Sequence, residues 1–489
     1  MGATMPTNIS TPRSDCFKHD IMLRSVKALC LVLVAIPFAV AWFGYYADQT
    51  VFKLSVVSRW LVVGLYMVLY YMFGRIYNAF LISYLRISEI IYGQALSVLI
   101  ADLFIGIFLS ILSQHLPNVM LISSTLAVQL LLIAAWAYYS HRWYFQTFAA
   151  KRTVVVYDMR EGMENLIQHY GLEKKFHVER IAKVSECLED LPMLEGMDAV
   201  FLSDIHSHER NVIIKYCVEH GVDALIIPRV GDILMSGAKE MHLFHLPILQ
   251  VNRYKPTPEF LLFKRTFDIA LSSVALLVLS PLMLIVGGLI RRDGGPAFYK
   301  QKRLTKDGKV FDILKFRSMK VDAEKDGVAR LSTGDNDDRI TPIGRFIRKV
   351  RIDELPQLIN ILRGEMSIVG PRPERPEIAA LYERELPEFK LRLQAKAGLT
   401  GYAQVYGKYN TTPYDKLQLD LMYIAKPSIW QELMICFSTV KVLFMKESTE
   451  GVAQGQMTAI GHEVEQDLEN NVAMDRNVRE TEPFTRTGT

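Results

Sequence analysis

Two adjacent carboxylates, Asp353 and Glu354, follow a short run of cations that includes Arg348. Carboxylates can hold a metal ion or attack phosphorus, and cations beside them can neutralise phosphate charge. Residues 300–352 carry 15 Lys or Arg against 8 Asp or Glu, so the surroundings are basic although the whole chain has a net charge of only +4. The pattern favours a phosphoryl-transfer site over a simple helix-capping pair with solvated cations around it.

One arginine lies in a loop whose backbone is restricted on both sides. In the sequence Gly370-Pro371-Arg372-Pro373, the two prolines fix their own φ angles and so limit the motion of the arginine between them. A guanidinium that is held still can bind phosphate through two parallel hydrogen bonds. Arg372 is therefore predicted to contact phosphate, with Pro371 and Pro373 shaping the substrate loop.

An apolar repeat predicts the element that positions the carboxylates. Its members fall at positions i, i+3, i+4 and i+7, namely Leu355, Leu358, Ile359 and Leu362. We expect a core-facing helix that begins near Asp353, and Pro356 fits its first turn, where the amide has no intrahelical partner. Asp353 would then lie at or beside the N-cap, where the helix dipole lowers the pKa of a carboxyl group and also favours phosphate binding.

The first third of the chain is strongly apolar. Four stretches, each long enough to cross a bilayer as a helix, cover residues 26–46, 56–74, 90–112 and 119–140. They have almost no polar face, which favours spanning helices over a soluble bundle. Lys and Arg gather before the first stretch, between the second and third, and after the fourth, so both ends of the group are predicted to be cytoplasmic, although Lys53 and Arg59 in the first link weaken this count.

The pattern changes to α/β in residues 150–255. Strands are predicted at Val154–Tyr157, Ala199–Leu202 and Ala224–Pro228, with helical stretches between them, which indicates a small open parallel sheet of the Rossmann kind. The first strand is followed by Asp158-Met-Arg-Glu-Gly162, so the glycine turn that lets a pyrophosphate approach the backbone is missing. We expect a structural, regulatory or dimerising role, with a homodimer as one possible outcome, rather than nucleotide binding.

A fifth apolar stretch, residues 267–290, has Lys and Arg at both ends and is interrupted by Ser280-Pro281. Proline removes a backbone hydrogen bond and kinks a helix, and a serine hydroxyl can satisfy the freed carbonyl. A fifth span is the alternative, but cationic flanks on both sides favour a helix that enters and leaves the membrane on one face. We predict a re-entrant helix in residues 260–292, broken at Ser280 and Pro281.

Taken together, the motifs between residues 260 and 450 resemble the catalytic signature of the bacterial sugar transferases known as polyprenyl-phosphate glycosylphosphotransferases, the monotopic phosphoglycosyl transferases. The matching residues are Lys264, Arg265, Phe267, Asp268, Gly295, Pro296, Phe298, Tyr299, Gln301, Arg303, Lys315–Met319, Asp338–Thr341, Asp353–Gln357, Val369–Pro373, Gly398–Gly401 and Gln404–Gly407. Two loop residues depart from the family pattern, because Thr305 replaces the usual glycine and Ala397 the usual proline.

The resemblance implies an enzyme that transfers a sugar 1-phosphate, with glucose as the commonest sugar, from a UDP-sugar to undecaprenyl phosphate and releases UMP. This would be the first membrane step of exopolysaccharide, capsule or O-antigen synthesis, with Mg²⁺ as the cofactor. Asp353 would form a covalent phosphosugar intermediate, and Glu354, together with Asp353, would hold the metal. The phosphate-binding candidates are Arg348, Arg372, Lys315, Arg317, Arg339 and Lys408.

The predicted fold is a membrane protein of mixed α and α/β class in the bacterial inner membrane, with its catalytic domain facing the cytoplasm and no nucleic-acid partner. Its parts are a disordered N-terminus (1–20), a four-helix transmembrane bundle (21–145), a Rossmann-like domain (150–255), the re-entrant helix (260–292), the catalytic domain (293–450) and a polar tail (451–489). Amphipathic helices in residues 417–446 fit either ordinary core or the membrane surface.

Two other functions remain open at this point. The chain could be a scaffold without activity in a polysaccharide-assembly complex, although an intact Asp353–Glu354 pair argues against that. It could also be an ordinary glycosyltransferase that moves only the sugar, which would release a nucleoside diphosphate rather than a monophosphate. Within the phosphotransferase reading, a direct ternary reaction is the alternative to a covalent intermediate.

Overall fold

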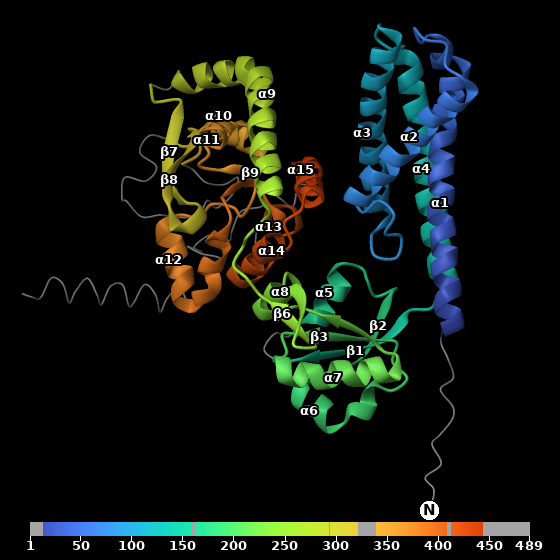
Figure 1. The fold of residues 1–489 in the computed structure, drawn as a ribbon, viewed down its shortest axis with the longest axis vertical. Coiled ribbons are helices and arrows are strands. Elements are labelled where there is room, and N and C mark those ends of the chain that lie inside the picture. The colour runs from blue at the N-terminus through green and yellow to red at the C-terminus, as the bar shows by residue number, and fades with distance from the viewer. Residues whose placement is uncertain (1–12, 159–161, 293, 321–338, 408–411, 444–489) are drawn as a thin grey trace, which may run out of the picture. The chain divides into compact units, whose positions relative to one another are not determined.

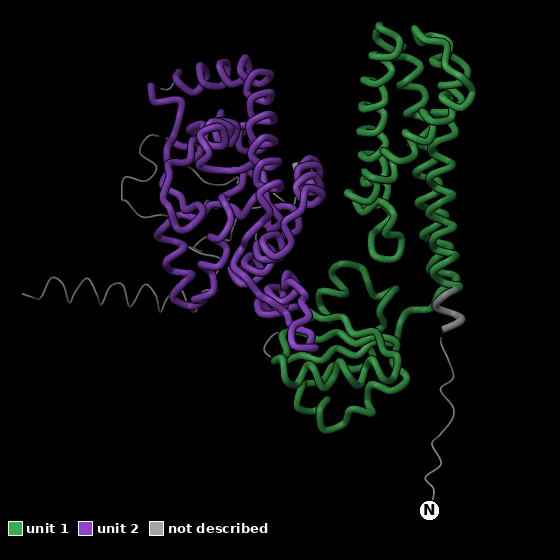
Figure 2. The backbone as a smooth tube through the Cα atoms, viewed as in Figure 1, with its two compact units in different colours: residues 1–227 green, residues 228–489 purple. Residues whose placement is uncertain are grey.

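A computed structural model describes residues 13–158, 162–292, 294–320, 339–407 and 412–443. The chain separates into two compact units, residues 1–227 and 228–489, which Figure 2 colours green and purple. The polar tail at 451–489, Lys408 and most of the predicted N-terminal segment 1–20 lie outside the described residues. Several apolar helices and a mixed α/β part are present, as the sequence predicts.

Four long helices open the first unit and pack against one another (Figure 1). They are α1 (Arg13–Gly44), α2 (Val56–Ile76), α3 (Ile87–Ser113) and α4 (Val119–Thr147). Their outer faces are apolar, since Val40, Leu61 and Ile111 are 67–71% exposed, whereas Gln94 and Gln129 are fully buried. Gln129 donates to the Val34 carbonyl and the Tyr66 hydroxyl oxygens. Buried polar groups inside an apolar surface suit a bilayer and not water.

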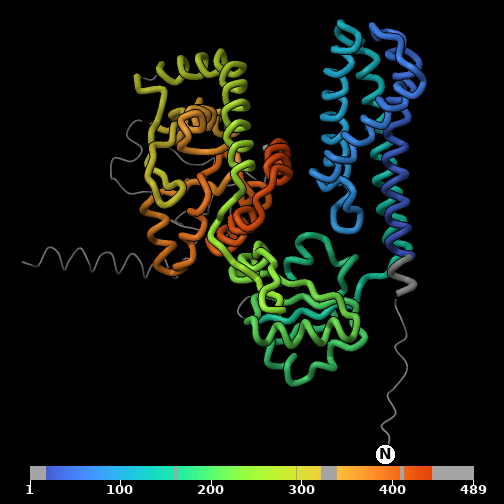
Figure 3. The backbone as a smooth tube through the Cα atoms, in the orientation of Figure 1, coloured from blue at the N-terminus to red at the C-terminus, as the bar shows by residue number. Residues whose placement is uncertain are grey.

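The rest of the first unit is a four-stranded parallel sheet with strand order β2-β1-β3-β4, followed as the green stretch of the tube in Figure 3. The strands are β1 (Lys151–Tyr157), β2 (Phe176–Lys183), β3 (Ala199–Ser203) and β4 (Asp223–Ile226), and the helices are α5 (Met163–His169), α6 (Val184–Glu189) and α7 (Ser207–His220). The sequence pattern did not predict β2, because this edge strand buries only Phe176 and Ala182 and its other side chains are largely polar.

The second unit begins at Pro228, so the boundary predicted near residue 255 falls inside it. Its first helix, α8 (Val230–Ser236), packs on α14 (Pro413–Ala425), and the hairpin of β5 (Lys239–Leu243) and β6 (Leu246–Gln250) follows. The contact is close, because a Cβ on Gly237 would lie 2.4 Å from the Ala425 carbonyl oxygen. Because α8 packs on α14, the residues from Pro228 onward belong to the second unit and not to the sheet.

The remaining elements of the second unit surround one apolar core that includes Ile361, Met366 and Leu421. They are α9 (Pro258–Arg291), the antiparallel pair β7 (Phe298–Leu304) and β8 (Val310–Phe316), α10 (Pro342–Lys349), α11 (Gln357–Arg363), the parallel pair β9 (Ser367–Val369) and β10 (Gly398–Thr400), α12 (Pro376–Glu385), α13 (Tyr402–Tyr406), α14 and α15 (Ile429–Leu443). The helices α14 and α15 contribute Leu417, Leu421 and Ile435 to this core.

Both ends of α9 pack on this same domain. Near its start, Lys264 donates to the Val369 carbonyl oxygen at 2.9 Å and forms an ion pair with Glu432. Near its end, Ile290 packs in a cluster with Phe316, and Figure 1 shows the helix bent between its two ends. The middle of α9 is apolar and exposed. A straight span could not return both ends to one side, so these contacts fit the predicted re-entrant path.

Ser280 and Pro281 lie inside α9, as predicted. The proline has no N–H, so the carbonyl oxygen of Leu277, four residues earlier, loses its usual helical partner. The Ser280 hydroxyl donates to that oxygen at 2.9 Å. The serine therefore satisfies the carbonyl that the proline frees.

Candidate active site

Glu354 accepts hydrogen bonds from two cations that come from different elements. Lys315 Nζ, on β8, lies 2.9 Å from Glu354 Oε1, and Arg372 Nη2, in the loop after β9, lies 3.1 Å from the same oxygen. The Glu354 side chain is only 13% exposed, whereas that of Arg372 is 38% exposed. The structure thus brings together three of the predicted site residues, with the arginine accessible to a ligand.

Asp353 lies in a 3₁₀ turn, Ile352–Glu354, and not at the N-cap of the following helix. Helix α11 begins at Gln357 with Pro356 as its N-cap residue, so the predicted start near Asp353 is wrong by about one turn. The turn forms because Arg351 adopts a left-handed conformation with φ of 55°. Since a helix dipole acts mainly within the first turn, it cannot be the main influence on the Asp353 carboxyl group.

The two carboxyl groups have pKa values shifted in opposite directions. Burial raises the pKa of Asp353, and the adjacent Glu354 adds to this, while Lys315 and Arg348 oppose it. Burial also works to raise the pKa of Glu354, but Lys315 and Arg372 outweigh it and hold that pKa well below its usual range. Glu354 is therefore the firmly ionised member, and the expected lowering at Asp353 is wrong because burial dominates there.

Arg348 lies on the last turn of α10, close enough to Asp353 to affect its pKa. Its Nη1 atom is buried and, within the described part of the chain, has no hydrogen-bond partner. A buried guanidinium nitrogen without an acceptor costs free energy unless a ligand supplies one. This atom is therefore a ready donor for a phosphate oxygen beside Asp353.

The loop that carries Arg372 is built by a close backbone approach. A Cβ on Gly370 would lie 2.3 Å from the Lys396 carbonyl oxygen, so only glycine lets the chain pass there. The next residues, Pro371 and Pro373, are buried. The loop is thus fixed on both sides of the arginine, as the two prolines predict.

A buried charge network that sequence reasoning missed supports this loop. Arg392, whose side chain is 2% exposed, donates from Nη2 to the Arg372 carbonyl oxygen at 2.8 Å and pairs with Asp420 at 2.6 Å. Arg303 donates to the Pro373 carbonyl oxygen at 3.0 Å. Glu374 pairs with Arg392 at 3.6 Å and also with Lys416.

The pKa of Glu374 and the spacing of Lys416 and Asp420 both reflect this charge network. Burial tends to raise the pKa of Glu374, but Lys416 and Arg392 outweigh it and lower it to about 2. Lys416 and Asp420 stand four residues apart on α14, a spacing that places two side chains on one helix face. That spacing was the one available signal, because nothing in the sequence links Arg392 to Arg372.

For the other predicted phosphate-binding residues, no hydrogen bond or ion pair with Asp353 or Glu354 is found among the described residues. Arg317 is buried and donates to the carbonyl oxygens of Pro296 at 2.8 Å and Ile290 at 3.2 Å. These two hydrogen bonds fix the end of α9 and the segment that follows it. Arg339 is half-buried, and its carbonyl oxygen accepts from the Lys320 amide. The prediction for Lys408 cannot be placed, because this residue lies outside the described residues.

A divalent cation would fit this site only together with a phosphate ligand. Asp353 and Glu354 offer oxygen atoms of the kind that Mg²⁺ prefers, but Glu354 Oε1 already accepts from two cations. With Lys315, Arg348 and Arg372 nearby, the positive charges outnumber the two carboxylates, so a bare metal ion would be repelled. Donor phosphates would reverse that balance, and the two carboxylates would then be the protein ligands.

Comparison with known proteins identifies this part of the chain. Residues 259–446 match the family model for bacterial sugar transferases. This segment is therefore similar to bacterial sugar transferases, as the sequence motifs predict, and its relatives include proteins named as undecaprenyl-phosphate sugar phosphotransferases. The match contains every predicted site residue.

Three relatives illustrate the similarity. An uncharacterized sugar transferase of Haemophilus influenzae is 31% identical over 301 residues, covering 55% of this chain and 63% of the relative. The undecaprenyl-phosphate galactose phosphotransferase of Salmonella typhimurium is 40% identical over 213 residues, covering 41% and 44%. The UDP-glucose:undecaprenyl-phosphate glucose-1-phosphate transferase of Escherichia coli is 38% identical over 212 residues, covering 42% and 44%. The chain thus spans about half the length of these relatives.

Proposed function

We propose that this protein transfers a sugar 1-phosphate from a UDP-sugar to undecaprenyl phosphate and releases UMP. The observation that carries the proposal is the buried Glu354 held by Lys315 and Arg372, next to Asp353 and near an Arg348 Nη1 atom that has no hydrogen-bond partner among the described residues. This arrangement offers one nucleophile and several cations for a diphosphate. The activities in the names of the Salmonella and Escherichia coli relatives agree with it.

The reaction proceeds by two displacements at phosphorus. An Asp353 carboxylate oxygen attacks the phosphorus that bears the sugar, the bond from that phosphorus to the bridging oxygen breaks, and UMP leaves with the electron pair. An oxygen of undecaprenyl phosphate then attacks the same phosphorus and breaks its bond to Asp353. The products are undecaprenyl diphosphate-sugar and a regenerated carboxylate.

The surrounding side chains contribute charge stabilisation. Arg348 and Arg372 donate to the donor's phosphate oxygens, and Lys315 stabilises the negative charge that develops on the transferred group. A Mg²⁺ ion held by Asp353 and Glu354 together with the phosphates would neutralise the leaving group. Burial raises the pKa of Asp353, whereas Lys315 and Arg348 oppose that shift and so favour the ionised carboxylate that attacks.

The reaction needs a membrane location on the side where nucleotide-sugars exist. We place the catalytic domain, residues 293–450, in the cytoplasm of a bacterial cell, with α1 to α4 spanning the inner membrane and residues 260–292 re-entering it. Support comes from the exposed apolar faces of α1 to α4 and from the return of both ends of α9 to one domain. Exopolysaccharide, capsule or O-antigen synthesis would use the product.

Release of UMP is the experiment that tests this function. Purified protein in detergent, supplied with undecaprenyl phosphate, Mg²⁺ and a panel of UDP-hexoses and UDP-N-acetylhexosamines, should release UMP with at least one donor. The Glu354→Gln variant should lose nearly all activity. Release of UDP would instead show an ordinary glycosyltransferase, and no turnover with any donor would favour the scaffold. The productive donor identifies the sugar, for which glucose is the first choice.

A further inference from the structure

The parallel sheet of the first unit has a topological switch point, the position at which α/β proteins commonly bind ligands. From β1 the chain moves to β2 on one side and then crosses to β3 on the other, so the order β2-β1-β3-β4 reverses direction between β1 and β3. Ligands of open parallel sheets bind at the carboxyl ends of the strands at such a switch point. The strand order alone therefore indicates the carboxyl ends of β1 and β3 as the place for a ligand.

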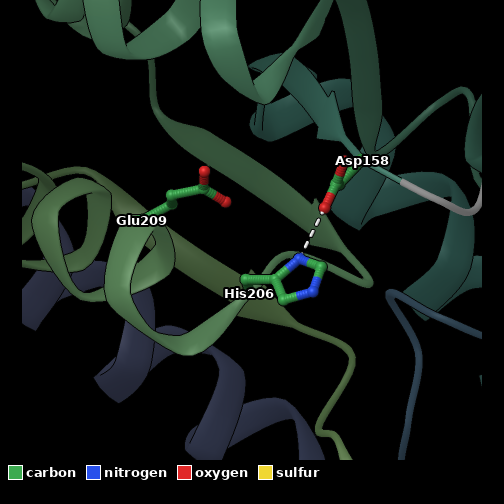
Figure 4. Close-up of side chains that lie close together, drawn as sticks. All are labelled: Asp158, His206 and Glu209. Atoms are coloured by element: carbon green, nitrogen blue, oxygen red, sulfur yellow. Dashed lines mark hydrogen bonds and ion pairs between the residues drawn. The ribbon is translucent and has the colours of Figure 1, made fainter.

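Three side chains with metal-binding atoms meet at that edge (Figure 4). Tyr157 and Ser203 form the last pair of β1 with β3, so Asp158 and the segment leading to His206 leave the sheet side by side. Glu209 lies one helical turn after His206, in the first turn of α7. One ligand atom of each of the three residues lies within 4.8 Å of the others.

An ordinary ion pair explains only part of this cluster. His206 Nδ1 and Asp158 Oδ2 lie 2.8 Å apart, which accounts for one carboxylate. Among the residues that the structure describes, Glu209 forms no hydrogen bond or ion pair, although its carboxylate faces the same group of atoms (Figure 4). Two carboxylates at this spacing repel each other, and a cation between them would remove that cost.

The chemistry of the edge selects the class of ligand. The glycine turn for a pyrophosphate is absent after β1, and two carboxylates would repel phosphate. One imidazole nitrogen with two carboxylate oxygens is a donor set for Zn²⁺ and similar first-row ions. Ligand atoms on one tetrahedral ion with bonds of about 2.1 Å lie about 3.4 Å apart, and the three atoms here, which all lie within 4.8 Å of one another, can reach that spacing by side-chain rotation.

We propose that Asp158, His206 and Glu209 bind one divalent transition-metal ion of the Zn²⁺ class at the switch point of this sheet. The ion would join the end of β1 to the start of α7 and so fix these two segments relative to each other. This site is separate from the Asp353–Glu354 pair and does not depend on the proposed transferase activity.

Zinc titration of the full-length protein in detergent tests the site, after removal of metal with a chelator. The wild type should bind one more equivalent of Zn²⁺ than His206→Ala, or bind that equivalent roughly tenfold or more tightly. Glu209→Gln should weaken the same equivalent. His208→Ala is the matched control, because it removes an exposed histidine from the same helix and should leave the wild-type result.

The result that overturns the proposal is equal stoichiometry and affinity in the wild type and His206→Ala, which would leave a plain ion pair between His206 and Asp158. Equal losses in His206→Ala and His208→Ala would also overturn it, because they would indicate unspecific binding to surface histidines. Circular dichroism of each variant should match the wild type, and Co²⁺ absorption supplies a second readout of the imidazole ligand.

Discussion

Arg392 donates a hydrogen bond of 2.8 Å to the backbone carbonyl oxygen of Arg372, and the same guanidinium pairs with Asp420. Arg392 therefore acts as a positioning residue, because it holds the backbone of the loop while the side chain of Arg372 reaches Glu354. The buried Arg392–Asp420 pair thus positions Arg372, one of the cations proposed to bind the UDP-sugar.

Removing this support should separate activity from stability. Arg392→Ala should lower the free energy of unfolding by about 3–5 kcal/mol, because it leaves Asp420 buried without its partner. The double variant Arg392→Met with Asp420→Leu should recover much of that loss, since apolar residues of similar volume replace a buried pair well. Denaturant unfolding and donor kinetics on the same samples provide the test.

The double variant should still show a raised KM for the UDP-sugar, since the Arg372 carbonyl remains unsupported. A double variant with wild-type kinetics would contradict the positioning role and leave Arg392 purely structural. Lys390→Met, which removes an exposed cation two residues from Arg392, is the control and should change neither quantity.

The pH dependence of turnover should reflect Asp353. Its pKa is raised by burial, so the reactive carboxylate is lost as the pH falls through a value above that of a free aspartate, about 3.9. Lys315→Met removes a cation that lowers this pKa, and its residual activity should show the acid limb of kcat/KM at higher pH than in the wild type. Lys309→Met, which removes an exposed cation just before β8, should leave the limb unmoved. An acid limb at or below the value for free aspartate would oppose this assignment.

Metal binding should depend on the donor. Because cations outnumber the two carboxylates, Mg²⁺ should bind weakly to the free protein and at least tenfold more tightly when a UDP-sugar is present, a coupling of about 1.4 kcal/mol. Equilibrium dialysis with Mn²⁺ as a Mg²⁺ substitute measures this, with Glu354→Gln as the variant that should lose the coupling. Equal Mn²⁺ affinity with and without donor would exclude the joint site.

The path of α9 can be tested by labelling. Cysteines placed next to Lys264 and next to Arg292 should both react from the cytoplasmic side of the membrane. Pro281→Leu restores an N–H for the Leu277 carbonyl and should move the second position toward the outside, whereas Ser280→Ala keeps the proline and should not. Labelling of the second position from outside in the wild type would show a fifth span.

Local patterns in the sequence predicted the presence of helix α11 but not the turn that precedes it. The i, i+3, i+4 spacing predicted a helix where α11 lies, but of the predicted core face only Leu358 is buried, whereas Ile359 and Leu362 are half-buried. It could not show that Arg351 takes a left-handed conformation, which adds a turn before the helix and moves Asp353 away from the N-cap.

Contacts between distant residues were the least predictable part of the site. The motif supplied Lys315, Glu354 and Arg372 as a set, but Lys315 and Glu354 are 39 positions apart and meet only because β8 passes beside the 3₁₀ turn. Arg392 and Arg372 are 20 positions apart with no periodic relation, so only the folded loop joins them. Edge strand β2 was missed for a related reason, since its polar side chains reflect exposure on the sheet edge rather than a loop.

Covalent labelling tests the central claim most directly. Protein incubated with Mg²⁺ and the productive UDP-sugar, labelled in the sugar and given without undecaprenyl phosphate, should retain label on a peptide that contains Asp353 and release an equal amount of UMP. Asp353→Asn should retain none, and addition of undecaprenyl phosphate should transfer the label to lipid. Fast turnover with both substrates but no label on the protein would contradict the nucleophile assignment and establish a direct ternary reaction.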